Sequence, residues 1–214
     1  MKASKVTLMY FVTILWVSSL FSCAGVATEK NSRSGKINPV ERVDATQDVE
    51  TIQLTSIYSI TMRAPLNESY DNIVFRSFDC SEQFQKDYPD ALKQCKEAII
   101  SQLNNKKNYL TVTDNAETSI PEKSLLIDIK IIDMRIVSKS ARLWGGVMAG
   151  ASYMDVILEM WDADTNQSIH KKHLYSYSNP FGSFYTDGAS DRNLPSDFGV
   201  LIGEYIFKLV PGTQ

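Results

Sequence analysis

The amino-acid sequence is short of the residues that mark non-globular protein classes. Its 214 residues include 10 glycines and 7 prolines, too few for a collagenous chain or for low-complexity disorder. Neither sign of charge dominates, because 22 basic against 25 acidic residues leave a net charge of −3, which provides no basic field to attract nucleic acid. A long apolar run occurs only at the N-terminus, so a multi-pass membrane protein is excluded as well. These absences leave one ordinary globular domain with an N-terminal extension.

The N-terminus has the features of a secretory signal peptide. Lys2 and Lys5 form a short cationic start, and residues 6–21 carry no charge. We therefore assign residues 1–22 to a signal peptide that is not part of the fold. The alternative is an uncleaved membrane anchor, because residues 6–27 are long enough to cross a bilayer as a helix of about 20 residues.

The end of this segment favours a lipoprotein. Leu20, Phe21, Ser22 and Cys23 resemble the bacterial lipobox, in which the cysteine thiol receives a diacylglyceryl group before cleavage. We predict lipidation at Cys23, whose acyl chains would anchor the protein durably to a membrane. By analogy with lipoprotein sorting, Ala24 after the cysteine does not resemble an inner-membrane retention signal. We therefore expect the outer membrane, with the domain facing the periplasm or the cell surface.

The segment after Cys23 is expected to be a flexible tether. Residues 24–50 mix charges with Ser, Asn, Thr, Gly and Pro, and they lack the apolar period of a strand or a helix. We therefore divide the chain into a lipidated tether over residues 23–50 and a single domain over residues 51–214. Random-coil scaling gives the tether a root-mean-square reach of roughly 30 Å.

Hydrophobic periodicity predicts an α+β domain. The amphipathic helices are expected from about Pro89 to Asn104 and over residues 196–210. A strand, the first helix and a strand form a β-α-β unit with parallel strands, and an antiparallel hairpin follows. This order predicts a two-layer sandwich of two helices on a mixed five- or six-stranded sheet. The expected strands cover residues 51–62, 70–78, 109–113, 124–137, 152–161 and 168–178.

Two local patterns add detail to this fold. The alternation of apolar residues changes phase at Ile131 and Ile132, which predicts a β-bulge in that strand. Gly199 and Gly203 lie one turn apart in the C-terminal helix and would let its backbone approach the sheet closely. The glycine-rich segment 145–151 is interpreted as a flexible connection or a close-packed turn.

Three short motifs carry a resemblance to a known family. They are the strand Tyr70–Val74, the glycine-containing segment Ser140–Ala151, and the strand and turn Val156–Thr165. In these motifs the chain resembles the bacterial lipoprotein family catalogued as domain of unknown function 4410. The family turn usually has Gly where this chain has Asn166, which accepts a left-handed backbone nearly as well. The resemblance implies an exported lipoprotein with an α/β domain and no established catalytic residues.

The sequence gives no support for a metal, a cofactor or a catalytic centre. Asp162, Asp164 and Asn166 match the first half of an EF-hand loop, but the required Gly and Glu are missing. His170 and His173 lie three apart in a predicted strand, so they point to opposite faces, and we expect both to be solvated. No nucleophile motif occurs. We therefore predict no cofactor, no metal site and no catalysis.

The two remaining cysteines are predicted to form a disulfide. Cys80 follows a strand and Cys95 lies in the first helix, and an exported protein reaches an oxidising compartment. The alternative is a buried free thiol, because Cys95 shares the apolar stripe of the helix with Leu92 and Ile99.

One long connection has the composition of a binding surface. Residues 178–195 form an unusually long loop that carries Phe181, Phe184 and Tyr185. We predict that these three rings bind a partner; the alternative is that they fold back as a lid over the sheet or the C-terminal helix. An anchor, a tether and a domain without a site favour a non-enzymatic lipoprotein that binds another cell-envelope component, as an adaptor or assembly factor. The alternatives are a small-molecule or lipid-binding accessory of an envelope transporter, with an apolar pocket beneath the glycine segment, and an enzyme with a diffuse site.

Overall fold

The computed structural model describes residues 49–60, 64–114 and 120–212. All of them belong to one compact unit, Asp44–Gln214. The signal peptide, Cys23 and almost all of the predicted tether lie outside the described residues. Within the described ranges, no helix combines the length and the apolar character needed to cross a membrane.

A six-stranded mixed sheet forms one layer of the domain, in the order β1-β6-β5-β4-β2-β3. Strand β2 runs parallel to β3 and β4, the β4-β5-β6 run is antiparallel, and β1 adds in parallel to the edge of β6. This arrangement confirms the predicted β-α-β unit followed by an antiparallel meander. The strands are β1 (Thr51–Gln53), β2 (Asn72–Asp79), β3 (Thr111–Thr113), β4 (Ser124–Arg135), β5 (Tyr153–Asp162) and β6 (Gln167–Tyr177).

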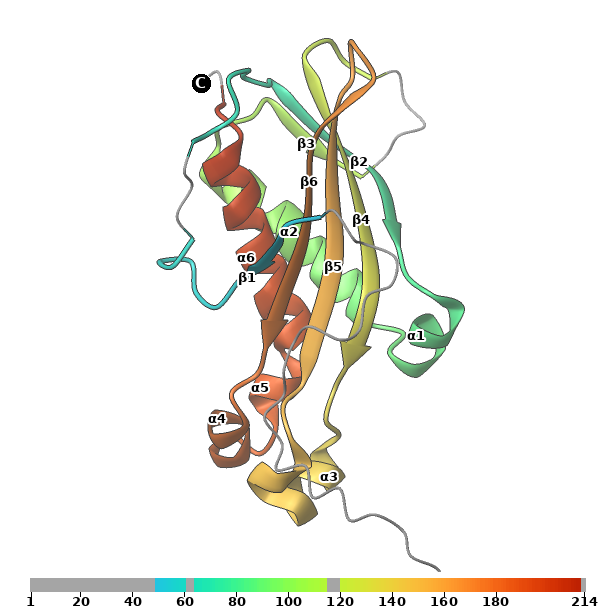
Figure 1. Cartoon of the computed structure of the whole chain (residues 1–214), viewed down its shortest axis with the longest axis vertical. Helices are drawn as coiled ribbons and strands as arrows, with labels where there is room; N and C mark the ends of the chain where they lie inside the picture. Colours follow the sequence, from blue (N-terminus) through green and yellow to red (C-terminus); the bar gives the residue numbers. More distant parts are fainter. Residues whose placement is uncertain (1–48, 61–63, 115–119, 213–214) are drawn as a thin grey trace, which may run out of the picture. The chain divides into compact units, whose positions relative to one another are not determined.

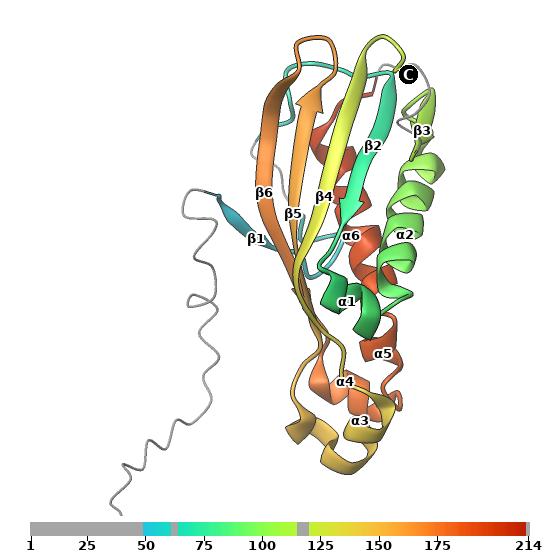
Figure 2. The same cartoon turned by 90° about the vertical axis from the view of Figure 1, so that its right-hand side faces the viewer.

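Two long helices form the second layer. Figure 1 shows α2 (Ala91–Lys106) and α6 (Leu194–Leu209), and Figure 2 shows both on one side of the sheet. The domain is therefore an α+β two-layer sandwich, as predicted. Shorter helical elements in the described connections are α1 (Glu82–Asp87), α3 (Lys139–Gly145), the 3₁₀ helix η1 (Gly146–Ala149), α4 (Pro180–Tyr185) and α5 (Ala189–Arg192).

The core lies between the sheet and the two long helices. Strand β5 alternates strictly, so that Met154 and Leu158 are buried against the helices while Asp155 and Glu159 stay partly exposed on the other face. The pairing of β4 with β5 shifts register between Ile131 and Asp133. The shift lies at the predicted phase change, so the predicted β-bulge is confirmed.

Two glycines set the distance between the helices of the second layer. A Cβ atom at Gly199 would lie 2.5 Å from the Cys95 carbonyl oxygen, and one at Gly203 would lie 2.8 Å from Cβ of Gln102. Any larger side chain would therefore force α6 away from α2. The sequence predicted that these glycines let α6 approach the sheet closely. In the structure they let α6 approach α2 closely.

Three predicted segments differ in the structure. The strand expected over residues 51–62 is only β1 in its described part, 51–60, because three residues pair with β6 and a turn follows; residues 61 and 62 lie outside the described residues. The supposed connection at residues 145–151 is mostly helical, in α3 and η1, and the side chain of Ser138 caps α3 by accepting from Ala141 N–H. The long connection 178–195 contains α4, capped by Asn179, and α5.

The predicted disulfide is wrong, because Cys80 and Cys95 are free thiols in the structure. Cys95 lies wholly buried on the apolar stripe of α2, beneath α6. Burial raises the pKa of its thiol to about 12. Such a thiol packs as a small apolar side chain and is chemically inert.

Candidate functional site

The strongest candidate site is a small lobe at one end of the sandwich. Residues 138–151 follow β4 and precede β5, and residues 178–193 follow β6 and precede α6. In this end lobe α3, η1 and α4 contact one another, and α5 contacts α4. Figure 2 shows these elements gathered beyond the end of the sheet.

The surface of the end lobe carries several large apolar side chains among its polar ones. Trp144 and Met148 are 88% and 93% exposed, and Tyr185 is 83% exposed. Large apolar side chains this open are uncommon on a monomer when they gather in one place. The exposed large apolar side chains of the end lobe are Leu143, Trp144, Met148, Phe181, Phe184 and Tyr185.

The size of this surface suits a macromolecular partner. At about 200 Å² for a fully exposed large side chain, the six side chains present on the order of 800 Å². Each side of a standard protein interface buries about 800 Å². Phe184 joins the two parts of the surface, because its ring lies 3.5 Å from the Cβ position of Gly146.

A buried ion pair takes the place of an apolar core inside the end lobe. Arg142 and Asp191 are 1% and 0% exposed, and Nε of Arg142 donates to Oδ2 of Asp191 at 2.9 Å. A second guanidinium nitrogen donates to Oδ1 at 3.0 Å. Two of the three remaining guanidinium hydrogens reach the carbonyl oxygens of Gly146 and Gly150 at 2.9 and 2.8 Å. One arginine thus fastens α3, η1 and α5 together.

Two serines complete this polar hub and join it to the sheet. The hydroxyls of Ser152 and Ser178 both donate to Oδ1 of Asp191 at 2.7 Å, and Val137 N–H donates to the Ser152 hydroxyl. Burial alone raises the pKa of Asp191, but the bonds from Arg142 and the two serines outweigh it, so the pKa lies below its usual value. The polar side chains of the hub bond to one another, and we therefore interpret the hub as structural.

The three residues predicted to bind a partner lie on this lobe and are exposed. Phe181, Phe184 and Tyr185 belong to α4, and none of them is buried as a lid would require. Sequence reasoning missed the other half of the surface, Leu143 to Met148, because it interpreted that stretch as a connection. The capping sequence that begins at Ser138 was the available signal for a helix there.

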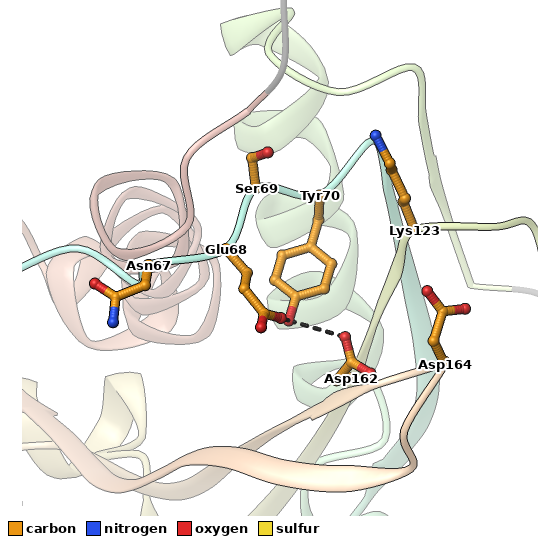
Figure 3. A pocket seen from close by; sticks show the side chains of 7 residues that line it. All are labelled: Asn67, Glu68, Ser69, Tyr70, Lys123, Asp162 and Asp164. Atoms are coloured by element: carbon orange, nitrogen blue, oxygen red, sulfur yellow. Dashed lines mark hydrogen bonds between the residues drawn. The ribbon is translucent and has the colours of Figure 1, made fainter.

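A polar pocket of about 340 Å³ lies at the other end of the sheet (Figure 3). The hydroxyl of Tyr70 lies 3.2 Å from carboxylate oxygens of both Glu68 and Asp162. Burial, then the negative charge of Asp162, raises the pKa of Tyr70. Asp162 also accepts bonds from the Thr165 backbone and hydroxyl at 2.6 and 2.7 Å, so it stabilises the β5–β6 turn, where Asn166 has a φ of 53°. This pocket differs in lining and place from the apolar pocket expected beneath the glycine segment.

The two histidines occupy opposite faces of β6, as predicted, but neither is fully solvated, because His170 is only partly exposed and His173 is buried. His170 Nε2 lies 2.9 Å from the Tyr205 hydroxyl of α6, and burial lowers the His170 pKa to about 4. His173 is 6% exposed on the other face and bonds to the Thr51 hydroxyl at 3.2 Å. Among the residues that the structure describes, no three His, Cys, Asp or Glu side chains are placed to hold a metal ion.

The family is identified by sequence comparison. Residues 45–172, more than half of the chain, match the family described as Domain of unknown function (DUF4410). The chain belongs to this family. The match includes α3 and η1 of the end lobe and ends before α4. No curated protein has significant sequence similarity to the chain.

Several solved structures are similar over most of their length at low sequence identity. The PelC dodecamer from Paraburkholderia phytofirmans is 14% identical with a TM-score of 0.45, and the match covers 71% of this chain and 94% of that one. The hypothetical protein CT253 from Chlamydia trachomatis is 12% identical with a TM-score of 0.38, covering 64% and 92%. A minor lipoprotein from Acinetobacter baumannii is 8% identical with a TM-score of 0.36, covering 67% and 98%. These similarities assign neither a function nor an assembly to this chain.

Proposed function

We propose that this protein is an exported lipoprotein, anchored in the outer membrane through acylated Cys23, that binds another cell-envelope protein. It acts as an adaptor or assembly factor and performs no catalysis. The aromatic side chains of α4, namely Phe181, Phe184 and Tyr185, contact the partner. The domain faces the periplasm or the cell surface and uses no cofactor.

The observation that carries this proposal is that the end lobe buries a charged pair and exposes large apolar side chains. The Arg142–Asp191 pair is buried inside it, and six large apolar side chains are exposed on its surface. Exposed apolar area costs free energy in water and promotes aggregation, unless a partner covers it. The aromatic side chains of α4 are of the types enriched at protein interfaces, and Tyr is among the residues that dominate binding energy there. The hub fixes the backbone beneath them, which lowers the entropy lost on binding.

The anchor is tested by replacing the predicted lipidation residue. Cys23→Ser is expected to abolish incorporation of a labelled fatty acid and to move the protein out of the detergent phase. The cause is direct, since the thiol is the acceptor of the diacylglyceryl group. Unchanged labelling and unchanged membrane extraction of the variant would contradict the lipoprotein part of the proposal.

The partner surface is tested by a photoreactive amino acid at Tyr185 in intact cells. The wild-type lobe is expected to give a crosslinked protein, and Phe181→Ala with Phe184→Ala is expected to abolish it. The melting temperature should change by less than about 3 °C, because surface substitutions are worth about 0.5 kcal/mol or less. Tyr58→Ala is the matched control, since Tyr58 is an exposed ring outside the end lobe. A double variant that keeps the crosslink, or that melts several degrees lower, would contradict the proposal.

A further inference from the structure

Met148 differs from the other methionines that the structure describes. It is 93% exposed on η1, whereas Met134, Met154 and Met160 are at most 5% exposed in the core. Met62 lies outside the described residues. Methionine usually fills gaps in a hydrophobic core, and Met148 does not. Its thioether is therefore open to reagents dissolved in the solvent.

An exposed thioether reacts with peroxides. The sulfur lone pair takes one oxygen atom from hydrogen peroxide, the O–O bond breaks, and the second oxygen leaves as water. The sulfur is oxidised to a sulfoxide and the peroxide is reduced. The product is a polar side chain that accepts hydrogen bonds, in place of a flexible apolar one.

The thiols in the described part of the chain compete poorly for the same oxidant. Cys95 is wholly buried in the core. Cys80 is half-buried, and burial, followed by the negative charge of Asp79, raises the pKa of its thiol. Peroxides attack the thiolate form, which a raised pKa makes scarce. Met148 is therefore the sulfur that we expect to react first.

Met148 lies beside the rings that are proposed to bind the partner. Its helix η1 contacts α4, and the Phe184 ring lies 3.5 Å from the Cβ position of Gly146, the first residue of η1. At about 200 Å² for a fully exposed large side chain, the three rings of α4 present about 400 Å². This is about half of the 800 Å² that each side of a standard interface buries. A partner of standard size on α4 therefore extends beyond it, and η1 adjoins it.

We propose that Met148 is an oxidation site, and that its conversion to the sulfoxide by a peroxide weakens partner binding at the end lobe. The inference rests on the proposed function, because the contact that it regulates is the one made by α4. A sulfoxide at the edge of this contact must give up its hydrogen bonds to water when the partner binds, which lowers the affinity about tenfold. The fold itself is unaffected, since Met148 lies outside the core.

Peptide mapping of the full lipoprotein in detergent tests the oxidation site. The protein is treated with hydrogen peroxide, the reaction is stopped with catalase, and the digest is analysed by mass spectrometry. In the native protein Met148 should gain one oxygen at least about tenfold faster than Met154 and Met160, which peroxide reaches only when the domain opens. Equal rates at the three positions in the native protein would overturn the inference.

Crosslinking in intact cells tests the effect on binding. Cells with a photoreactive amino acid at Tyr185 are exposed to hydrogen peroxide before illumination. The crosslinked protein should decrease about tenfold in the wild type and persist in Met148→Leu, which is apolar, similar in size and forms no sulfoxide. The partner meets the same peroxide in both strains, so this variant controls for damage to the partner.

A second variant imitates the oxidised side chain without peroxide. Met148→Gln carries a polar side chain of similar length, so it should lower the crosslink in untreated cells. Its melting temperature should stay within about 3 °C of the wild type, because the substitution is on the surface. An unchanged crosslink in this variant would overturn the inference.

The outcomes separate this inference from the proposed function. A crosslink that persists in wild-type cells although Met148 is oxidised would overturn the regulation and leave the adaptor proposal intact. Equal losses in the wild type and in Met148→Leu would also overturn it, because another group would then be the target. Absence of any crosslink in untreated wild-type cells would contradict the adaptor proposal itself.

Discussion

The sandwich and the end lobe are built in opposite ways. Between the sheet and α2 and α6, apolar side chains such as Leu158 and Phe198 are fully buried, and charged side chains lie on the outer surface. In the end lobe a charged pair is fully buried, and Trp144 and Met148 are exposed. The sandwich is stabilised by removing apolar surface from water. The lobe is stabilised by a closed set of hydrogen bonds, which leaves its apolar side chains available for binding.

The comparison has an energetic consequence. A sheet packed on helices loses stability in proportion to the volume or contact that a substitution removes. A buried ion pair behaves differently, because removing one partner strands the other charge away from water. The end lobe should therefore tolerate changes on its surface and fail abruptly when its interior is changed.

The largest effect is expected for Asp191→Ala. The variant leaves Arg142 buried without its carboxylate, at a cost of about 3–5 kcal/mol in the free energy of unfolding. Urea denaturation followed by far-UV circular dichroism measures it. Lys139→Ala is the matched control, because Lys139 pairs with Asp187 at the exposed surface of the same lobe, and it should cost less than about 1 kcal/mol. Equal costs for both variants would remove the distinction between the two regions.

The second largest effect is expected for a substitution between the two long helices of the sandwich. Gly199→Ala should destabilise the domain by about 1–3 kcal/mol, because its new Cβ meets the Cys95 carbonyl and pushes α6 from α2. The same urea titration measures this loss. Gly182→Ala in the end lobe is a suitable control, since the nearest atom to its Cβ position lies 3.7 Å away. A neutral Gly199→Ala would show that the helices do not need this close approach.

The sandwich could be predicted from sequence because its elements are long and periodic. Strand β5 alternates over ten residues, and the phase change at Ile131 located the bulge. Such patterns follow directly from one buried and one exposed face. The parallel pairing of β2 with β3 followed from the handedness of the crossover.

The end lobe could be predicted only in part, for a physical reason. Helices of four to seven residues are too short to display a period, so α3 and α5 were not seen. The hub joins Arg142 to Asp191, 49 positions apart, and no local pattern marks such a pair. The aromatic composition of α4 was visible in the sequence, but it left open whether the rings are exposed or fold back as a lid, and the structure shows them exposed. The disulfide prediction failed because the spacing of the two cysteines in the sequence does not reveal that Cys95 is buried in the core.

A moderate effect is expected from pH. The His170 pKa is lowered to about 4 in the folded protein, against about 6.5 in an unfolded chain. Between these values the unfolded state binds a proton that the folded state does not, so stability falls as pH falls from 6.5 to 4. Because the ring is partly exposed, solvent screening limits the loss to about 1 kcal/mol.

The pH effect is measured by urea titrations at several pH values, with His170→Gln as the comparison. The variant should show a smaller decline of stability between pH 6.5 and 4.5. Carboxylates such as Asp191, whose pKa is lowered, lose their contribution only at still lower pH, as they protonate. Parallel pH profiles for wild type and variant would mean that His170 is not buried as a neutral ring.

The smallest effect concerns the cysteines of the sandwich. Both thiols are free, so a reducing agent should change the free energy of unfolding by less than about 0.5 kcal/mol, within the range of neutral changes. Alkylation followed by intact mass should modify Cys80 in the native protein and Cys95 only after unfolding, because Cys95 is wholly buried. A mass two hydrogens lower before reduction would reveal a disulfide and contradict the structure.

The central claim is that the end lobe, and not the opposite end of the sheet, is the binding end of the domain. The most direct measurement places a photoreactive amino acid at Phe181 or at Asn166, which lies in the β5–β6 turn at the far end, in the full lipoprotein in intact cells. The account predicts a crosslinked protein from Phe181 and none from Asn166. Crosslinks from Asn166 with none from Phe181 would contradict it.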